Sequence, residues 1–146
     1  MKEVALLACL DETFTSGALL ARRLGLSRVA VWKQAHRLQE AGYPIEIVQG
    51  RGYRLRPGSP APHLLQPLLQ GRFGRAYRYL GRTTSTQDEL RAWAEAGAPE
   101  GAVVLAEQQT GGRGRRGRPW ISPPGAGLYF SVLLRPRLPL TELLRL

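Results

Sequence analysis

The chain has 146 residues, 43% of them hydrophobic, which suits one ordinary folded domain or two small ones. Its net charge of +10 favours polyanionic partners, because Lys and Arg neutralise phosphates. No apolar run approaches the ~20 residues of a membrane span, and no signal-peptide pattern opens the chain, so we expect a cytoplasmic protein with no membrane partner. Cys9 is the only cysteine, which excludes an internal disulfide. His36 and His63 lack metal-ligand spacing, so we expect no metal site.

Three helical patterns and a hairpin pattern occupy the first sixty residues. One face of a short first helix is predicted from the spacing of Val4, Leu7 and either Leu10 or Ala8. Ser16 is suited to N-cap a helix over Gly17–Leu24. Ser27 is suited to N-cap a third helix over 28–41. Two short apolar segments, Ile45–Val48 and 53–55, flank a glycine-rich turn typical of a hairpin. This order is typical of a winged helix-turn-helix.

The third predicted helix has an apolar face and a basic face. Val31, Ala35 and Leu38 fall at i, i+4 and i+7 and form the predicted core stripe. The opposite face carries basic and hydrogen-bonding side chains, which favours DNA binding in the major groove with support from the hairpin. The predicted DNA-binding residues are Ser27, Arg28, Val29, Trp32, Lys33, His36 and Arg51. The alternative is a small three-helix scaffold used for protein contacts.

The second half alternates strand and helix patterns after a proline-rich joint at 58–63, which is typical of a semi-rigid linker. A short helix is expected over 64–69. Strands are predicted over 76–80, 102–107 and 127–134, and a helix over 88–97. Thr86 and Glu89 have the spacing of a capping box, so one hydroxyl of the preceding Thr/Ser cluster is expected to cap this helix.

A glycine- and arginine-rich segment, residues 111–120, joins two of the predicted strands. It holds four arginines and four glycines in eight positions and then Trp120. Glycine lets successive amide groups converge on an anion, and each arginine fork matches a phosphate or carboxylate. A disordered nucleic-acid-binding tail is the alternative, but the position between two core strands favours a ligand lid. We expect the segment to be mobile when empty and ordered around an anionic ligand.

Polar side chains gather at two places beside these elements. Thr84, Ser85, Thr86 and Gln87 stand at a strand-to-helix junction, and Gln109 lies just before the glycine-rich segment. Hydroxyls and amides both donate and accept hydrogen bonds. The cluster is therefore suited to a neutral ligand that presents donors and acceptors.

These motifs together resemble those of the bifunctional biotin protein ligases and biotin-operon repressors of bacteria. The matching residues are Thr84-Ser85-Thr86-Gln87, Gln109 before Gly111, Gly112-Arg113-Gly114-Arg115-Arg116-Gly117-Arg118, Trp120 and Gly127-Leu128-Tyr129. The resemblance implies an α+β fold: a winged helix-turn-helix over 1–57, a linker over 58–63 and the first part of a mixed α/β ligase domain over 64–146. It implies ATP-dependent activation of biotin to biotinyl-5′-AMP and transfer to a lysine of a biotin carboxyl carrier protein.

The resemblance also implies roles for individual residues. Biotin-binding roles fall to Ser85, Thr86, Gln87, Gln109, Arg113, Gly114, Arg115 and Trp120. The adenylate loop adds Gly112, Arg116, Gly117 and Arg118, and Arg115 has the catalytic role of retaining the adenylate. The implied cofactors are biotin and ATP with its Mg²⁺. The implied partners are the carrier protein, operator DNA and a second copy in a ligand-linked homodimer. The resemblance also implies that the protein represses transcription in response to biotin.

The chain departs from the family pattern at three places. Gln87 stands where the family usually has Asn, and Pro119 stands where a basic or polar residue is usual. The family's Lys-Trp-Pro-Asn-Asp strand does not occur, and no lysine follows Lys33. We therefore expect the front portion of a longer protein or a truncated product, with little ligase activity by itself. Two alternatives are a regulator that only senses biotin or its adenylate, and a related lipoate-type acyl ligase.

Overall fold

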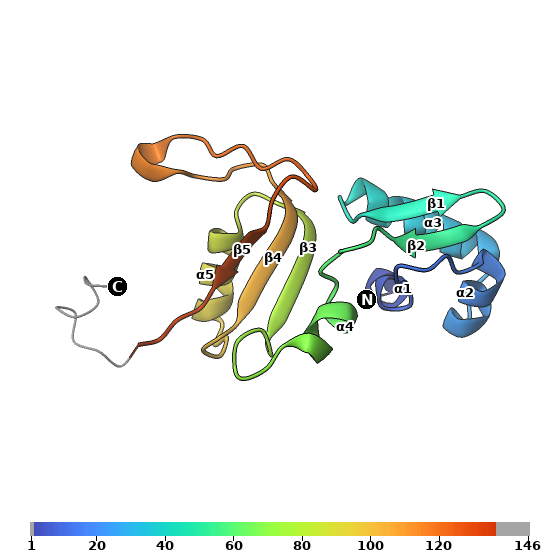
Figure 1. Cartoon of the computed structure of the whole chain (residues 1–146), viewed down its shortest axis with the longest axis horizontal. Helices are drawn as coiled ribbons and strands as arrows, with labels where there is room; N and C mark the ends of the chain where they lie inside the picture. Colours follow the sequence, from blue (N-terminus) through green and yellow to red (C-terminus); the bar gives the residue numbers. More distant parts are fainter. Residues whose placement is uncertain (1, 137–146) are drawn as a thin grey trace.

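Three helices and a β-hairpin form the N-terminal unit, as the sequence predicts (Figure 1). The computed structural model describes residues 2–136. The helices are α1 (Lys2–Ala8), α2 (Gly17–Leu24) and α3 (Arg28–Glu40). The side chains of Ser16 and Ser27 accept hydrogen bonds from the amides of Leu19 and Ala30, so both predicted N-caps are confirmed.

The hairpin packs beside these helices. Its strands are β1 (Ile45–Val48) and β2 (Gly52–Leu55), paired antiparallel. Tyr53 of β2 also exchanges two backbone hydrogen bonds with Thr15, of 2.8 and 2.9 Å. The segment before α2 therefore pairs with β2 through a single residue, on the side of β2 away from β1.

The core stripe of α3 is confirmed. Val31 and Ala35 are completely buried and Leu38 nearly so. They share one apolar cluster with residues of α1, α2 and β2, whose most buried side chains include Leu6, Leu20 and Leu55. Burial of these aliphatic side chains supplies the main stabilisation of the unit.

A three-stranded mixed sheet forms the second unit, in the order β3-β4-β5 (Figure 1). Its strands are β3 (Tyr77–Thr83), β4 (Val103–Gln109) and β5 (Tyr129–Val132), with α5 (Thr86–Glu95) between the first two. β3 and β4 run parallel, and β5 runs antiparallel to β4. The predicted α+β class is confirmed.

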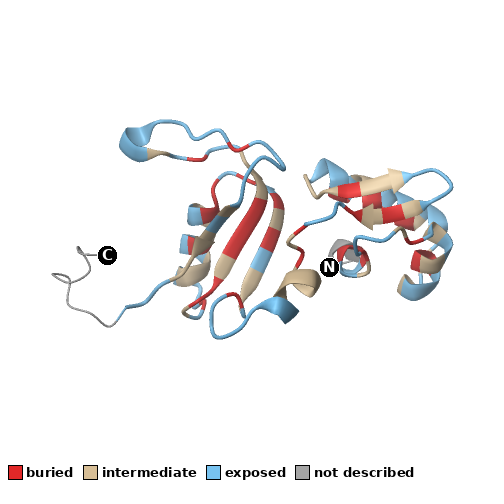
Figure 2. Cartoon of the chain, viewed as in Figure 1, coloured by how far each residue is buried: buried red, intermediate tan, exposed pale blue. Residues whose placement is uncertain are grey.

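The two faces of this sheet pack against different partners. Successive residues of a strand point to opposite faces. Tyr79 and Leu105 accordingly belong to the apolar cluster of the winged helix. Leu80 and Val104 join a second cluster with Leu90 of α5. The centre of the sheet is buried, whereas the segment after β4 is mostly exposed (Figure 2).

Several predicted boundaries in this half were wrong. The first strand continues to Thr83, the helix begins at Thr86 instead of 88, and the last strand is confined to Tyr129–Val132. The predicted helix over 64–69 is a single α-turn, α4 (Pro62–Leu65), followed by the 3₁₀ turn η1 (Gln66–Leu68). The polar end of β3 has no strand-like composition, and its parallel pairing with β4 makes it a strand.

The predicted capping box of α5 was also wrong. Ser85 is the N-cap residue, and its side chain makes no capping hydrogen bond. The Thr86 hydroxyl instead contacts Gln109 and Ser131, and Glu89 accepts a hydrogen bond from the Thr83 hydroxyl. Tertiary contacts have therefore taken over the hydroxyls that the local spacing assigned to capping.

A seam of close contacts joins the winged helix to β3. A Cβ on Gly81 would lie 2.3 Å from the Ala41 carbonyl oxygen and 2.6 Å from the Tyr43 nitrogen. The Tyr43 hydroxyl donates a 3.1 Å hydrogen bond to the Tyr79 carbonyl, and the two rings meet edge to face. Only glycine permits the backbones to approach this closely.

Burial raises the pKa of Tyr79 well above its usual value, and its hydrogen bond to the Glu107 carboxylate raises it further. The hydroxyl donates this bond to Glu107 at 2.5 Å. Burial likewise raises the pKa of the neighbouring Tyr77. Both phenols therefore stay neutral at pH values where an unfolded chain would ionise them.

The predicted linker packs against both units. The Gly58 amide donates to the Glu12 carboxylate, and the Tyr77 hydroxyl donates to the Pro60 carbonyl. Ala61 is completely buried. The boundaries 1–57, 58–63 and 64–146 stay predictions. Among the described helices, none combines the length and apolar character that crossing a bilayer requires.

Candidate ligand pocket and nucleic-acid interface

A pocket of about 540 Å³ opens where the C-terminal end of β4 meets the start of α5 and the strand β5. It is lined by Ser85, Thr86, Gln87, Gln109, Arg113, Gly114, Arg115, Trp120, Leu128, Tyr129, Phe130 and Ser131. All eight residues that the resemblance assigned to biotin binding are in this set. The structure thus brings together two motifs that are separated by more than twenty residues in the sequence.

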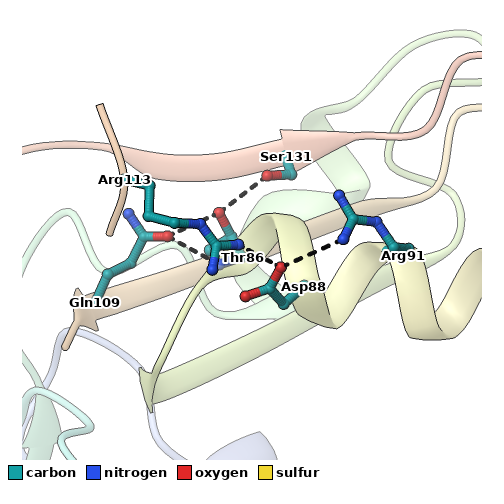
Figure 3. A network of polar contacts seen from close by, with 6 residues as sticks. All are labelled: Thr86, Asp88, Arg91, Gln109, Arg113 and Ser131. Atoms are coloured by element: carbon teal, nitrogen blue, oxygen red, sulfur yellow. Dashed lines mark hydrogen bonds and ion pairs between the residues drawn. The ribbon is translucent and has the colours of Figure 1, made fainter. Parts of the chain in front are cut away.

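The polar floor of the pocket is organised by Gln109 and Thr86 (Figure 3). The Gln109 Oε1 atom accepts hydrogen bonds from the Thr86 amide at 2.8 Å and from its hydroxyl at 3.1 Å. The Thr86 hydroxyl also lies 2.9 Å from the Ser131 hydroxyl, and Gln109 Nε2 donates to Ser122 Oγ at 3.4 Å. Neutral donors and acceptors therefore converge from three elements, an arrangement suited to a polar uncharged group.

Segment 111–120, the glycine-arginine loop, folds back on itself beyond β4 (Figure 1). The Trp120 amide donates to the Gly112 carbonyl and the Gly114 amide to the Arg118 carbonyl, each at 2.8 Å. A 3₁₀ turn, η2 (Arg115–Gly117), forms the tip, where Arg116 has a positive φ of 60°. The expected mobility of the empty loop stays a prediction.

The arginines of this loop have different surroundings. Arg113 forms an ion pair of 2.5 Å with Asp88 in the first turn of α5, and Arg91 lies 3.8 Å from the same carboxylate oxygen (Figure 3). Arg115 lines the pocket together with Arg113. The remaining members of the predicted adenylate loop, Gly112, Arg116, Gly117 and Arg118, are not among its lining residues.

Trp120 lines the pocket although 61% of its surface is exposed. Leu128 and Phe130 are also at least half exposed beside it. The pocket therefore combines a polar floor with an apolar wall, and its two arginines supply positive charge at the loop side.

Sequence reasoning missed Ser131, Ser122 and Asp88. Ser131 follows Tyr129 by two residues on β5, so strand alternation places both on one face, and this signal could have identified it. Ser122 has no comparable signal, because its proximity to Gln109 comes from an isolated bridge between segments. Asp88 was visible only as an acidic residue near a helix start.

A second and larger groove, of about 1150 Å³, lies between α3 and the hairpin. Of the seven predicted DNA-binding residues, five line it: Arg28, Val29, Trp32, His36 and Arg51. Ser27 and Lys33 do not line it, and Ser27 serves as the N-cap. The structure therefore gathers most of the predicted surface into one concave face.

Aromatic contacts fix the side chains along this groove. The rings of Trp32 and His36 lie 4.1 Å apart between centroids, and a His36 nitrogen lies 2.9 Å from the Trp32 carbonyl oxygen. Arg51 and Arg54 both stack on the ring of Phe14, at 4.1 and 4.4 Å. Cation–π contacts hold the two guanidinium groups at the hairpin, and Arg54 also forms an ion pair with Glu46 at 2.7 Å.

Residues 2–136 hold no group of three His, Cys, Asp or Glu side chains that could bind a metal ion. The pocket chemistry described above rests on hydroxyls, amides and guanidinium groups.

Comparison with known protein families matches the two parts of the chain to different families. Residues 3–54 match the HTH domain family, and residues 79–145 match the Biotin/lipoate A/B protein ligase family. The chain is therefore an HTH domain followed by a ligase-type domain segment, within an α+β fold.

Individual relatives match over most of the chain. The chain is 39% identical over 132 residues to the bifunctional ligase/repressor BirA of Bacillus subtilis (strain 168), covering 88% of this chain and 41% of the relative. It is 37% identical over 138 residues to the bifunctional ligase/repressor BirA of Escherichia coli (strain K12), covering 92% of this chain and 41% of the relative. The chain thus corresponds to the N-terminal part of such proteins and spans about two-fifths of their length.

Another relative matches over a shorter stretch. The biotin–[acetyl-CoA-carboxylase] ligase of Mycobacterium tuberculosis (strain ATCC 25618 / H37Rv) is 39% identical over 84 residues, which cover 56% of this chain and 32% of the relative.

Proposed function

We propose that the chain supplies the DNA-binding domain and the biotin-binding part of a biotin protein ligase that also represses transcription. The convergence of Gln109, Thr86 and Ser131 under an arginine-bearing loop carries this proposal. Biotin has a neutral ureido head and a negative carboxylate, so a neutral polar floor and a basic rim complement its two ends. The ligase segment match and the BirA relatives support the same assignment.

The proposed reaction has two steps. A biotin carboxylate oxygen attacks the α-phosphorus of ATP, which forms biotinyl-5′-AMP and releases pyrophosphate. A carrier-protein lysine amine then attacks the acyl carbon, which releases AMP and a proton and leaves an amide. Arg113 and Arg115 would stabilise the carboxylate and then the adenylate phosphate, because charge-assisted bonds to anions are the strong ones. Closure of the glycine-arginine loop would exclude water from the mixed anhydride.

Biotin binding to the protein tests the polar floor directly. Gln109→Met keeps the size of the side chain but removes its hydrogen bonds, and we expect biotin affinity to fall about tenfold, because one or two hydrogen bonds are lost. Gln108→Met is the matched control, since Gln108 bonds Arg82 and does not line the pocket. Equal affinity for the parent and Gln109→Met, measured by calorimetry, would refute the assignment of the pocket.

The lipoate branch of the same family is the second candidate, because the family description covers both acids. Lipoate has no ureido group, so the hydrogen-bonding floor formed by Gln109 and Thr86 favours biotin. Competition between the two acids in one titration distinguishes them. Tighter binding of lipoate than of biotin would transfer the proposal to the acyl ligases.

We further propose that the groove between α3 and the hairpin binds duplex operator DNA. Its arginines and exposed Trp32 match a backbone-plus-base surface. Neutralising about four to six phosphates gives a slope of log affinity against log salt of about −4 to −5. Arg51→Gln should reduce the slope by about one, whereas Arg72→Gln, which lies outside the groove, should leave it unchanged. A salt-independent affinity would remove the DNA assignment.

Four finer proposals follow from the assigned family. Mg²⁺ accompanies ATP, the acceptor is a biotin carboxyl carrier protein, a ligand-linked homodimer binds the operator, and the protein acts in the cytoplasm. Sedimentation of the protein with and without biotin, ATP and magnesium tests the dimer. A mass unchanged by these ligands would exclude ligand-linked association.

A further inference from the structure

The ion pair between Arg113 and Asp88 connects the glycine-arginine loop to α5 (Figure 3). The two residues are 25 positions apart in the sequence. At the base of the loop, the Gly111 amide donates to the Thr84 carbonyl at 2.8 Å, whereas the backbone bonds of Gly114 and Trp120 close on other loop residues. Among the described residues, the ion pair is therefore the polar contact that ties residues 113–118 to the body. The ion pair is therefore placed to determine where the loop lies.

The geometry of the pair leaves Arg113 able to bind a second anion. A single terminal nitrogen, Nη2, contacts Asp88, so most of the five N–H donors of the guanidinium remain for another partner. Asp88 itself does not line the pocket, whereas Arg113 does. The carboxylate thus contacts the arginine from outside the pocket lining.

The charge balance of the cluster also suits an anion. Asp88 lies between Arg113 and Arg91, so the three groups together carry one positive charge, and Arg115 adds another at the pocket. The first turn of α5 stabilises the Asp88 carboxylate, because amide dipoles at a helix start favour negative charge. Asp88 can therefore anchor an arginine without cancelling the positive potential of the pocket.

We propose that Asp88 is a positioning residue that anchors Arg113 and holds the glycine-arginine loop over the pocket before ligand binds. This inference rests on the proposed function, in which Arg113 contacts the carboxylate of biotin and the phosphate of its adenylate. Ordering eight glycine- and arginine-rich residues is entropically costly, and a preformed anchor removes part of that cost from binding. Asp88 acts through Arg113 and does not touch the ligand.

Limited proteolysis of the protein without ligand tests the anchor. Asp88→Asn should raise trypsin cleavage after Arg115 and Arg116 about two- to fivefold, the range expected for losing a partly exposed ion pair. Asp88→Glu should restore most of the protection, because it keeps the charge. Arg91→Gln is the matched control: it removes the weaker, 3.8 Å partner of the same oxygen and should leave cleavage near the parent rate. Equal effects of Asp88→Asn and Arg91→Gln would overturn the inference.

A double-mutant cycle separates the anchor from general loosening of α5. In an Arg113→Gln background, Asp88→Asn should produce no further increase in cleavage, because the partner is already absent. A full further increase would show that Asp88 acts elsewhere and would overturn the proposal.

Binding measurements distinguish a residue that positions Arg113 from one that only stabilises the fold. In Asp88→Asn, biotinyl-5′-AMP should dissociate about two- to fivefold faster, whereas the dissociation constant for biotin should change less, because the ureido floor is intact. Unchanged adenylate release in a variant with parent-like proteolysis would overturn the anchor. If the parent itself bound no adenylate, the proposed function would fail, while the proteolysis arm would still decide the role of Asp88.

Discussion

The seam at Gly81 and the glycine-arginine loop both depend on glycine, but for opposite structural reasons. At the seam, backbone from the winged helix lies where a Gly81 side chain would be, and the neighbouring Tyr79 is buried. At the base of the loop, a Cβ on Gly112 would still lie 2.9 Å from the Trp120 carbonyl oxygen. Further out, a Cβ on Gly114 would meet only ordinary contacts at 3.4 and 3.6 Å, and most neighbouring residues are exposed. Glycine therefore serves close packing in the first region and backbone adaptability in the second.

This difference predicts where substitutions affect stability and where they affect binding. A packed seam loses folding free energy when it is disturbed, because its neighbours cannot move away. A substitution in an exposed loop changes the folding free energy little, but it can greatly reduce the affinity for an anionic ligand. The two regions should therefore respond to different assays.

The largest expected effect is at the seam. Gly81→Ala should destabilise the protein by about 3 kcal/mol, because the added methyl group collides with backbone atoms of Ala41 and Tyr43. Urea unfolding measures the change. Gly114→Ala is the matched control and should cost less than about 0.5 kcal/mol. A Gly81→Ala protein as stable as its parent would mean that the seam does not form.

The next effect concerns the loop and appears in binding instead of stability. Arg115→Gln should weaken retention of biotinyl-5′-AMP about ten- to hundredfold, the value of one charge-assisted hydrogen bond to phosphate. Biotin affinity should fall less, because we propose that the ureido head binds at Thr86 and Gln109 and not at Arg115. Stopped-flow release of the adenylate and calorimetry with biotin provide the two numbers. An equal loss of both affinities would contradict the role given to Arg115.

The smallest effect is the alkaline sensitivity of the seam. The unfolded chain ionises Tyr79 near its ordinary pKa of about 10, whereas burial keeps the folded phenol neutral above that value. Above about pH 10, the unfolded state binds fewer protons than the folded state. The contribution of Tyr79 to the free energy of unfolding is therefore fully present below about pH 10. As pH rises further, it is lost at about 1.4 kcal/mol per pH unit. Tyr79→Phe should remove this part of the slope of the unfolding free energy against pH.

Urea unfolding at several pH values between neutral and alkaline measures that slope. Tyr77→Phe offers a second variant, because burial raises the pKa of Tyr77 in the same direction. Slopes for both variants that equal the parent slope would contradict the buried, neutral state of these phenols.

Local sequence signals determined the winged helix and the general order of the second half. The N-caps Ser16 and Ser27 and the stripe at Val31, Ala35 and Leu38 were all predicted, because caps and helix periodicity depend on residues within a few positions of each other. The glycine-arginine run also predicted an anion-binding segment, and this stays a prediction. These features need no knowledge of distant contacts.

Only the tertiary structure decided the contacts between distant segments. The Thr86 hydroxyl bonds Gln109 and Ser131 and does not cap its helix, and Asp88 pairs with an arginine 25 residues away. The close approach at Gly81 likewise depends on where α3 ends relative to β3. Such contacts arise when the sheet brings strand ends together, and no local pattern in the sequence records which side chains then meet. The sequence alone determined the kinds of chemistry available, and the packing of the sheet decided which groups share one site.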